Sequence, residues 1–180
     1  MEKIFTKLYR ERPDLFDIQY TTQDKSKFKF LLDLIVPSKI IDGGCGLSTF
    51  IPTLMGETTQ YLGIDILPDL INIQNSNIRN NCEYLCKDIT TDTLPYADII
   101  ILSDVIQFFN NHTIKKLFYN IKRNGIQRVL LTSNNNSTNF TESVNGFGRQ
   151  VNILTGPFGI KSDMSIHLSN KTYLNLIYEW

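Results

Sequence analysis

The chain has 180 residues, with 18 basic and 18 acidic side chains, and therefore no formal net charge at neutral pH. Such a balance gives no general field that attracts nucleic acid or an anionic membrane. No apolar run approaches the ~20 residues that cross a bilayer, and the charged segment from Met1 to Arg12 lacks a signal-peptide core. We expect a soluble cytoplasmic protein (in the host cytoplasm if the source is a virus), monomeric or homodimeric, with neither a nucleic-acid nor a membrane partner.

The three cysteines are an odd number without zinc-site spacing. Cys82 and Cys86 would lie on one strand, too far apart to pair with each other. We expect Cys45, Cys82 and Cys86 to be reduced thiols in the core. No metal-ligand cluster is visible in the sequence, so no metal is expected.

Residues 1–36 are predicted to form two helical pieces, broken near Pro13, that pack on a core domain of residues 37–180. The second piece carries apolar residues at helical spacing: Phe28, Leu31, Leu32 and Ile35. The lysines between them are expected to face water: Lys25, Lys27 and Lys29. Asp24 is a plausible N-cap of this helix.

A glycine-rich turn follows the first predicted strand. Ile40 and Ile41 are β-branched and apolar, and their strand ends at Asp42, after which come Gly43, Gly44 and Gly46. Helical apolar spacing resumes at Leu47, and a glycine turn at the end of a first parallel strand is where open α/β sheets bind nucleotide-like ligands. The dinucleotide pattern Gly-x-Gly-x-x-Gly fails, because Thr49 takes the third glycine position. A plain strand-to-helix turn is the alternative.

Three later strands also end in polar residues. Asp65 ends residues 61–65, Asp88 ends residues 84–88, and residues 97–102 deliver Ser103 and Asp104. Asp65 lies about 20 residues beyond the glycine turn, the spacing at which a carboxylate reaches the ribose hydroxyls of a bound nucleoside. The alternatives are a helix N-cap for Asp88 and, for Asp104, a role in orienting a loop or capping the next helix.

The remaining elements complete an α/β sheet. A helix is predicted over about 113–123 and ends at Asn124-Gly125, and strands are predicted at 129–132, 148–154 and 173–178. The polar segment 133–148 is long enough to be a lid or binding loop. We therefore predict seven strands in a doubly wound, mostly parallel sheet with an antiparallel edge strand and helices on both faces.

The glycine turn resembles the first motif of class I S-adenosylmethionine-dependent methyltransferases, Asp-x-Gly-x-Gly-x-Gly, with Ser48 in place of the last glycine. From Tyr61 onward the chain resembles a poorly characterised family of small class I methyltransferases that is often linked to glycan modification. The resemblance covers about three-quarters of the chain. The matching positions are Tyr61, Gly63, Asp65, Pro68, Leu70, Ile71, Asp88, Ile89, Asp92, Leu94, Pro95, Ala97, Asp98, Asp104, Leu130 to Thr132, Gly146, Arg149, Leu154, Pro157, Phe158, and Lys171 to Tyr178.

This resemblance implies a Rossmann-like class I fold and the cofactor S-adenosylmethionine, released as S-adenosylhomocysteine. The cofactor-binding residues it implies are Asp42, Gly43, Gly44, Gly46, Asp65, Ile66, Asp88, Ile89 and Ser103. Residues 20–22 would lie near the amino-acid end of the cofactor, or else form an ordinary polar loop.

The resemblance also implies in-line methyl transfer to a hydroxyl of a sugar or glycan acceptor, with a rhamnose-type glycan as the example. Phe108 stands where many relatives have a histidine, so either Asp104 or His112 would take the proton. Arg149 would contact the substrate, or anchor the sixth strand through a salt bridge.

Two other functions fit the same fold. One is a nucleic-acid or protein methyltransferase, against which residues 103–106 lack the Asn/Asp-Pro-Pro-Tyr/Phe motif for a flipped base. The other is a catalytically inactive partner protein that binds S-adenosylmethionine, for which Phe108 is the main support.

Overall fold

The computed structural model describes residues 1–16, 20–47, 50–77, 79–137, 139, 145–146, 148–169 and 172–178. Its strands are β1 (Lys39–Gly43), β2 (Gln60–Asp65), β3 (Cys82–Cys86), β4 (Ile99–Leu102), β5 (Val129–Ser133), β6 (Met164–His167) and β7 (Tyr173–Ile177). Its helices are α1 (Glu2–Glu11), α2 (Thr22–Ile35), α3 (Phe50–Leu54), α4 (Pro68–Ser76) and α5 (Asn111–Arg123), with short 3-10 helices η1 (Pro13–Phe16) and η2 (Ile106–Phe108). Among the residues named above, Ser48, Thr49 and Lys171 lie outside the described part.

The strands form one sheet in the order β3-β2-β1-β4-β5-β7-β6. The first five strands of this order pair in parallel, and β7 pairs antiparallel with both β5 and β6. The predicted mostly parallel sheet of seven strands with an antiparallel edge region is confirmed. The chain order reverses between β1 and β4, and ligands of open α/β sheets bind at such a reversal, outside the carboxyl ends of the strands.

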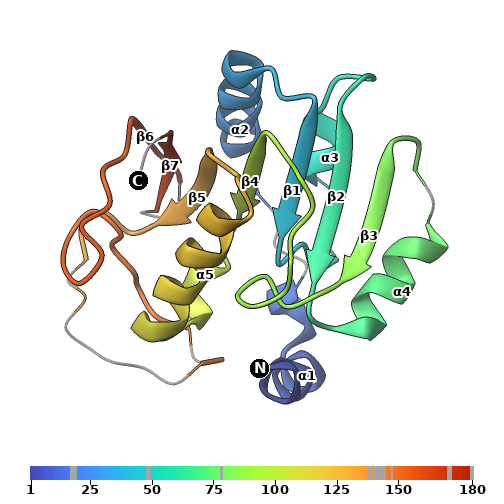
Figure 1. Cartoon of the computed structure of the whole chain (residues 1–180), viewed down its shortest axis with the longest axis horizontal. Coiled ribbons are helices and arrows are strands. Elements are labelled where there is room, and N and C mark those ends of the chain that lie inside the picture. Colours follow the sequence, from blue (N-terminus) through green and yellow to red (C-terminus); the bar gives the residue numbers. More distant parts are fainter. Residues whose placement is uncertain are drawn as a thin grey trace.

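Helices cover both faces of the sheet (Figure 1). Successive strand residues point to opposite faces, so Ile41 and Ile100 belong to the apolar cluster under α5, whereas Ile40 and Ile99 belong to the cluster under α2 and α3. All four side chains are at most 1% exposed. Burial on both faces explains why these strands read as continuous apolar runs.

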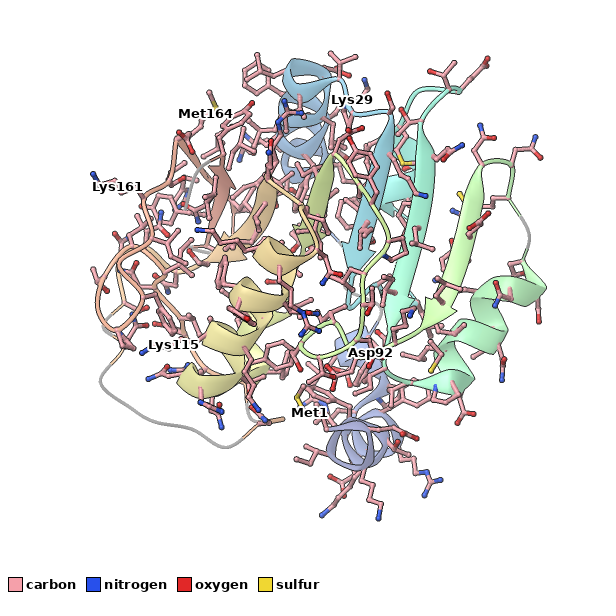
Figure 2. The ribbon with its side chains drawn as sticks, in the orientation of Figure 1. Met1, Lys29, Asp92, Lys115, Lys161 and Met164 are labelled. Atoms are coloured by element: carbon pink, nitrogen blue, oxygen red, sulfur yellow. The ribbon has the colours of Figure 1, made fainter. Side chains whose placement is uncertain are left out.

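The N-terminal segment lies below the carboxyl ends of the central strands (Figure 1). Helix α1 ends before Pro13, as predicted, and inserts Phe5 into the cluster under α5. The carbonyl of Phe16, in η1, accepts the N–H of Leu47 at 2.7 Å, which joins this segment to the glycine turn. Figure 2 shows Met1 in the same region, beneath the strand ends.

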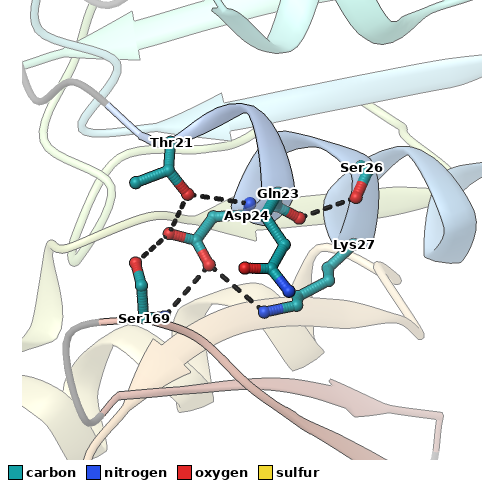
Figure 3. Close-up of polar contacts among 6 residues, drawn as sticks. All are labelled: Thr21, Gln23, Asp24, Ser26, Lys27 and Ser169. Atoms are coloured by element: carbon teal, nitrogen blue, oxygen red, sulfur yellow. Dashed lines mark hydrogen bonds and ion pairs between the residues drawn. The ribbon is translucent and has the colours of Figure 1, made fainter.

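The N-cap of α2 is Thr21, so the assignment of Asp24 as the cap is wrong. The Thr21 hydroxyl accepts the Asp24 N–H at 3.1 Å, which leaves the Asp24 carboxylate for other partners (Figure 3). That carboxylate accepts the N–H of Ser169 at 3.0 Å and the ammonium of Lys27 at 3.4 Å. Lys27 is consequently only 22% exposed, and not fully in water as predicted.

The predicted strand over 148–154 is wrong, and the sixth strand is instead Met164–His167. Val151 and Ile153 are fully buried, which explains the alternating pattern. The backbone groups of this segment bond to loops, with the Val151 carbonyl accepting Asn134 N–H at 2.7 Å and the Ile153 carbonyl accepting Ile160 N–H at 2.9 Å. Alternation reports burial on one side, and here it marks a buried loop.

The cysteines are free, but only Cys45 is buried; Cys82 is partly exposed and Cys86 is exposed. The expectation of three core thiols is therefore wrong for Cys86. None of the described helices has the length and apolar character needed to cross a membrane. Within the described residues, no group of three or more His, Cys, Asp or Glu side chains could hold a metal ion.

Candidate functional site

A cavity opens where the sheet order reverses, below the carboxyl ends of β1, β2, β3 and β4. It holds about 880 Å³ of free space, its mouth to solvent included. Nine of the twelve residues predicted for the site line it: Asp42, Gly44, Gly46, Asp65, Ile66, Asp88, Ile89, Ser103 and Asp104. The four strand ends singled out by the sequence therefore meet in one place.

The glycine turn is packed too closely to accept side chains. Gly44 has φ +76°, and a Cβ on it would lie 2.6 Å from Val105 Cγ2. Gly46 has φ +53°, and a Cβ there would lie 2.5 Å from the carbonyl oxygen of Phe16. The protein's own packing thus requires glycine at both positions, whether or not a ligand approaches. Gly43 lies inside β1, outside the cavity lining, against Leu102.

Asp65 presents a buried carboxylate at the end of β2. It is 6% exposed, and its two oxygens accept the N–H groups of Gly46 at 3.1 Å and Leu67 at 3.0 Å. Burial raises the pKa of Asp65, an effect that these backbone donors partly oppose. Each carboxylate oxygen has about two lone-pair positions, so Asp65 can accept two further hydrogen bonds, as a vicinal diol would require.

Asp88 is not a helix N-cap, because no helix begins after it; it holds a turn at the cavity wall. Its Oδ1 accepts the N–H of Thr90 at 2.9 Å and the Thr90 hydroxyl at 2.6 Å, which holds the turn after β3. Its own N–H donates to Asp92 at 2.9 Å. Asp88 also lines the cavity together with Ile89. A turn-holding carboxylate is thereby fixed in position at the cavity wall.

Asp42 is the most deeply buried acid of the cavity wall, at 3% exposure. The hydroxyl of Tyr61 donates to its Oδ2 at 2.8 Å. Burial raises the pKa of Asp42 to about 7; the Tyr61 hydrogen bond opposes the shift and the nearby charge of Asp65 adds to it. Asp42 therefore exchanges a proton near neutral pH, and a cation bound beside it would favour its charged form.

Asp104 has unusual backbone geometry and several donors. It has φ +54°, the left-handed region that residues other than glycine rarely adopt. The Thr132 hydroxyl accepts Asp104 N–H at 2.7 Å and donates to Oδ1 at 3.1 Å, and Gln107 Nε2 donates to the same oxygen at 2.5 Å. The Tyr20 hydroxyl donates to Oδ2 and lies 2.7 Å from Ser103 Oγ.

The sequence did not point to Thr132 or Gln107, and it left Tyr20 between a cofactor contact and an ordinary loop. Tyr20 lines the cavity. Its partner Asp104 is 84 residues away, so no local spacing could have indicated the contact.

Besides Gly43, two predicted residues lie outside the cavity lining. His112 is exposed in the first turn of α5. Arg149 donates from Nε to the Phe109 carbonyl at 3.2 Å and from Nη2 to Asn111 Oδ1 at 2.6 Å. Arg149 therefore joins the segment that follows Gly148 to the start of α5.

Apolar side chains form the rest of the lining, and the sequence did not assign them to the site. They include Met1, Phe5, Leu8, Leu15, Phe16, Phe108 and Phe109. Five of these come from the N-terminal segment, which was predicted only to pack on the core. Phe5 and Leu8 lie three residues apart, on one face of α1, and this spacing was the available signal.

Comparisons with known proteins agree on the class of domain. A family model described as "Methyltransferase domain" matches residues 41–127. No curated protein matches the chain in sequence.

Three similar solved structures are named methyltransferases. Human N-acetylserotonin methyltransferase in complex with S-adenosylmethionine has a TM-score of 0.69 at 16% identity, over 98% of this chain and 59% of that one. N-methyltransferase NodS from Bradyrhizobium japonicum, in complex with S-adenosylhomocysteine, has a TM-score of 0.68 at 13% identity, over 96% of this chain and 98% of that one. Magnesium protoporphyrin IX methyltransferase from Synechocystis, with S-adenosylmethionine bound, has a TM-score of 0.67 at 13% identity, over 98% of this chain and 94% of that one.

At these identities the structures show the fold and leave the acceptor open. The resemblance indicated by the motifs is confirmed: the chain has the fold of class I S-adenosylmethionine-dependent methyltransferases, and nearly half of it matches the methyltransferase family model.

Proposed function

We propose that the protein is an S-adenosylmethionine-dependent methyltransferase that methylates a hydroxyl of a sugar or glycan. The observation that carries the proposal is the convergence of four strand ends, each with an acidic or glycine residue chosen from the sequence, on one cavity. A structural turn at the first strand alone would not require acids at the ends of the next two.

The residues present fit the cofactor. Asp65 retains acceptor capacity for the two ribose hydroxyls, and Asp88 with the N–H of Ile89 would hold the adenine ring. Asp42 and the glycine turn would face the amino-acid end, where a carboxylate suits an ammonium group. When bound, the cofactor supplies a methyl group on a positively charged sulfur.

We propose that Asp104 is the general base that takes the proton of the acceptor hydroxyl. Asp104 lines the cavity, whereas His112 is exposed outside it, and a general base must lie within hydrogen-bond reach of the proton it takes. The fold adds proximity by holding the two reactants together, an effect worth several kcal/mol. For Arg149 we propose an anchoring role at the start of α5.

The acceptor class depends on the resemblance to the glycan-linked family, and the polar groups of the cavity are compatible with it. Ser103, Asp104 and Tyr20 offer hydrogen-bond partners to neighbouring hydroxyls, and the ring of Phe108 offers an apolar face to the C–H surface of a sugar. A sugar ring makes both kinds of contact, hydrogen bonds through its hydroxyls and apolar packing through its C–H face.

The first test is calorimetric titration with S-adenosylhomocysteine. We expect micromolar binding to the wild type, and a loss of at least about tenfold in Asp65→Ala, because the variant loses the diol acceptor. Asp69→Ala is the matched control, since Asp69 is exposed in the first turn of α4 and lies outside the cavity lining. A folded wild type that binds nothing would contradict the proposal.

Labelled methyl transfer then separates the alternatives. Rhamnose-type glycans and nucleosides are offered with labelled cofactor, and label on a glycan that is absent in Asp104→Asn supports the proposed reaction. Cofactor binding without transfer to any acceptor would favour an inactive binding protein. Transfer to nucleosides would contradict the glycan assignment while leaving the methyltransferase assignment intact.

A further inference from the structure

The two oxygens of the Asp104 carboxylate have different partners. Oδ1 accepts the Thr132 hydroxyl at 3.1 Å and Gln107 Nε2 at 2.5 Å. A carboxylate oxygen offers about two lone-pair positions, so these two donors fill Oδ1. An acceptor hydroxyl entering the cavity must therefore approach Oδ2.

Tyr20 donates to this second oxygen. Since its proton is used there, the 2.7 Å contact with Ser103 Oγ is a bond in which Ser103 donates. Burial raises the pKa of Tyr20 well above its ordinary value, and the neighbouring charge of Asp104 adds to the shift, so Tyr20 stays a donor at neutral pH.

The position of the Tyr20 hydroxyl is fixed by aromatic packing. Its ring centroid lies 5.1 Å from that of Phe28 in α2 and 4.9 Å from that of Phe50 in α3. Phe28 and Phe50 belong to the apolar cluster under α2 and α3. The packed ring of Tyr20 thus holds its hydroxyl against Oδ2, and this ring belongs to a segment separate from the loop that carries Asp104.

The backbone of Asp104 needs such support. A left-handed non-glycine residue persists where its surroundings over-determine it, and such residues cluster at functional sites. Thr132 holds its N–H and Oδ1, Gln107 holds Oδ1, and Tyr20 holds Oδ2. Tyr20 is the partner that acts on the oxygen left for the acceptor.

We propose that Tyr20 is a positioning residue for Asp104: it occupies one lone-pair position of Oδ2 and directs the other to the acceptor hydroxyl. This proposal rests on the proposed methyltransferase function. In the transfer, the acceptor O–H bond breaks and its proton goes to Oδ2, while the acceptor oxygen bonds to the methyl carbon. The carbon–sulfur bond breaks with its electron pair staying on sulfur, and Tyr20 keeps its own proton.

The test uses Tyr20→Phe, which keeps the packed ring and removes the hydroxyl. Tyr119→Phe is the matched control, because Tyr119 is 69% exposed on α5. The first readout is the carboxyl carbon resonance of Asp104 in labelled protein without cofactor. We expect this resonance to move in Tyr20→Phe and to stay in Tyr119→Phe, with the midpoint of thermal unfolding nearly unchanged in both.

The second readout separates positioning from cofactor contact. We expect Tyr20→Phe to bind S-adenosylhomocysteine within about threefold of the wild type, and the kcat of methyl transfer to fall by roughly 10- to 100-fold. In a double-mutant cycle with Asp104→Asn, the effect of Tyr20→Phe on kcat should disappear, since its target carboxylate is gone. A purely structural role would give additive effects.

An unmoved Asp104 resonance, an unchanged kcat or additive effects would each overturn the proposal. A parallel loss of S-adenosylhomocysteine binding in Tyr20→Phe would also overturn it, because Tyr20 would then be a cofactor contact. These results differ from failure of the proposed function itself, which would appear as a wild type that binds no S-adenosylhomocysteine.

Discussion

The cavity and the edge of the sheet bury polar groups in opposite ways. At the cavity, Asp42 and Asp65 are carboxylates that keep acceptor capacity, although burial raises the pKa of both. At the edge, an asparagine network around Asn175 buries neutral amides that donate to and accept from one another. The difference teaches that spare hydrogen-bonding capacity in buried groups, and not burial itself, distinguishes a candidate site from structural polar packing.

The asparagine network consists of Ser133, Asn135, Asn152, Asn175 and their partners. Asn175 is fully buried in β7; its amide nitrogen donates to Ser133 Oγ at 2.9 Å and its oxygen accepts Asn135 Nδ2 at 2.9 Å. Asn152 donates to the carbonyl of Asn135 at 2.7 Å. The described part of the predicted loop after β5 is therefore tied to the sheet edge.

The largest effect is expected from Asp104→Asn, which asks whether the cavity acid does chemistry. Asparagine keeps the shape and tolerates left-handed backbone, but it cannot take a proton. We expect methyl transfer to fall by roughly 10²- to 10⁴-fold while S-adenosylhomocysteine affinity stays within a few-fold. Labelled-methyl assays measure this, with Asp69→Asn as the control. Full activity in Asp104→Asn would show that Asp104 is not the base.

A smaller effect is expected from Asp42→Asn on the pH dependence of stability. The raised pKa of about 7 means that the native state keeps a proton that the unfolded chain loses near 3.8. The stability from this proton is complete below about pH 4 and is lost as pH rises to about 7. Asp42→Asn should remove this loss and gain up to roughly 4 kcal/mol at pH 8.

Urea unfolding at pH 5 and pH 8 measures the Asp42 effect, with Asp69→Asn as the control. The same variant should bind S-adenosylhomocysteine more weakly, because a neutral amide replaces the partner of the ammonium group. An unchanged slope of stability between pH 5 and pH 8 would show that Asp42 is not the titrating group.

A substitution in the asparagine network should lower the unfolding free energy without changing ligand affinity. Asn175→Ala removes the donor to Ser133 Oγ and the acceptor of Asn135 Nδ2, and we expect a loss of about 2–3 kcal/mol in unfolding free energy. S-adenosylhomocysteine affinity of the folded variant should not change. Chemical denaturation and calorimetry together decide this, and weakened binding in a stable variant would mean that the two regions are coupled.

The smallest effect is expected at the N-cap of α2, Thr21, which directly follows Tyr20. Thr21→Ala removes the acceptor of Asp24 N–H and should cost about 1 kcal/mol. Thr53→Ala is a control of the same residue type within α3. If Thr21→Ala also lowered methyl transfer, the cap would be acting on its neighbour Tyr20.

Most of the fold was predictable because its signals are local. Buried strands such as 99–102 read as apolar runs, and the turn after α5 carries Asn124 and Gly125 where a helix end requires them. The sixth strand was misplaced because Val151 and Ile153 alternate like a strand although their backbone pairs with loops. Burial patterns do not specify hydrogen-bond partners.

The candidate site was predictable where it follows strand ends and not where it depends on long-range contacts. Strand ends gave Asp42, Asp65, Asp88 and Asp104, since parallel strands finish at one edge of the sheet. The contact of Tyr20 with Asp104 spans 84 residues, and the apolar cover from the N-terminal segment depends on how that segment docks. The first has no spacing that a sequence displays, and for the second the spacing of Phe5 and Leu8 indicates an apolar face but not where it docks.

The left-handed backbone at Asp104 also shapes how this protein could diverge. Glycine and asparagine adopt that conformation most readily, so one amino-acid replacement could delete the carboxylate and leave the fold intact. Most other replacements would add strain there. If Asp104 is the base, as we propose, a single replacement of this kind would therefore remove it and leave the rest of the cavity lining in place.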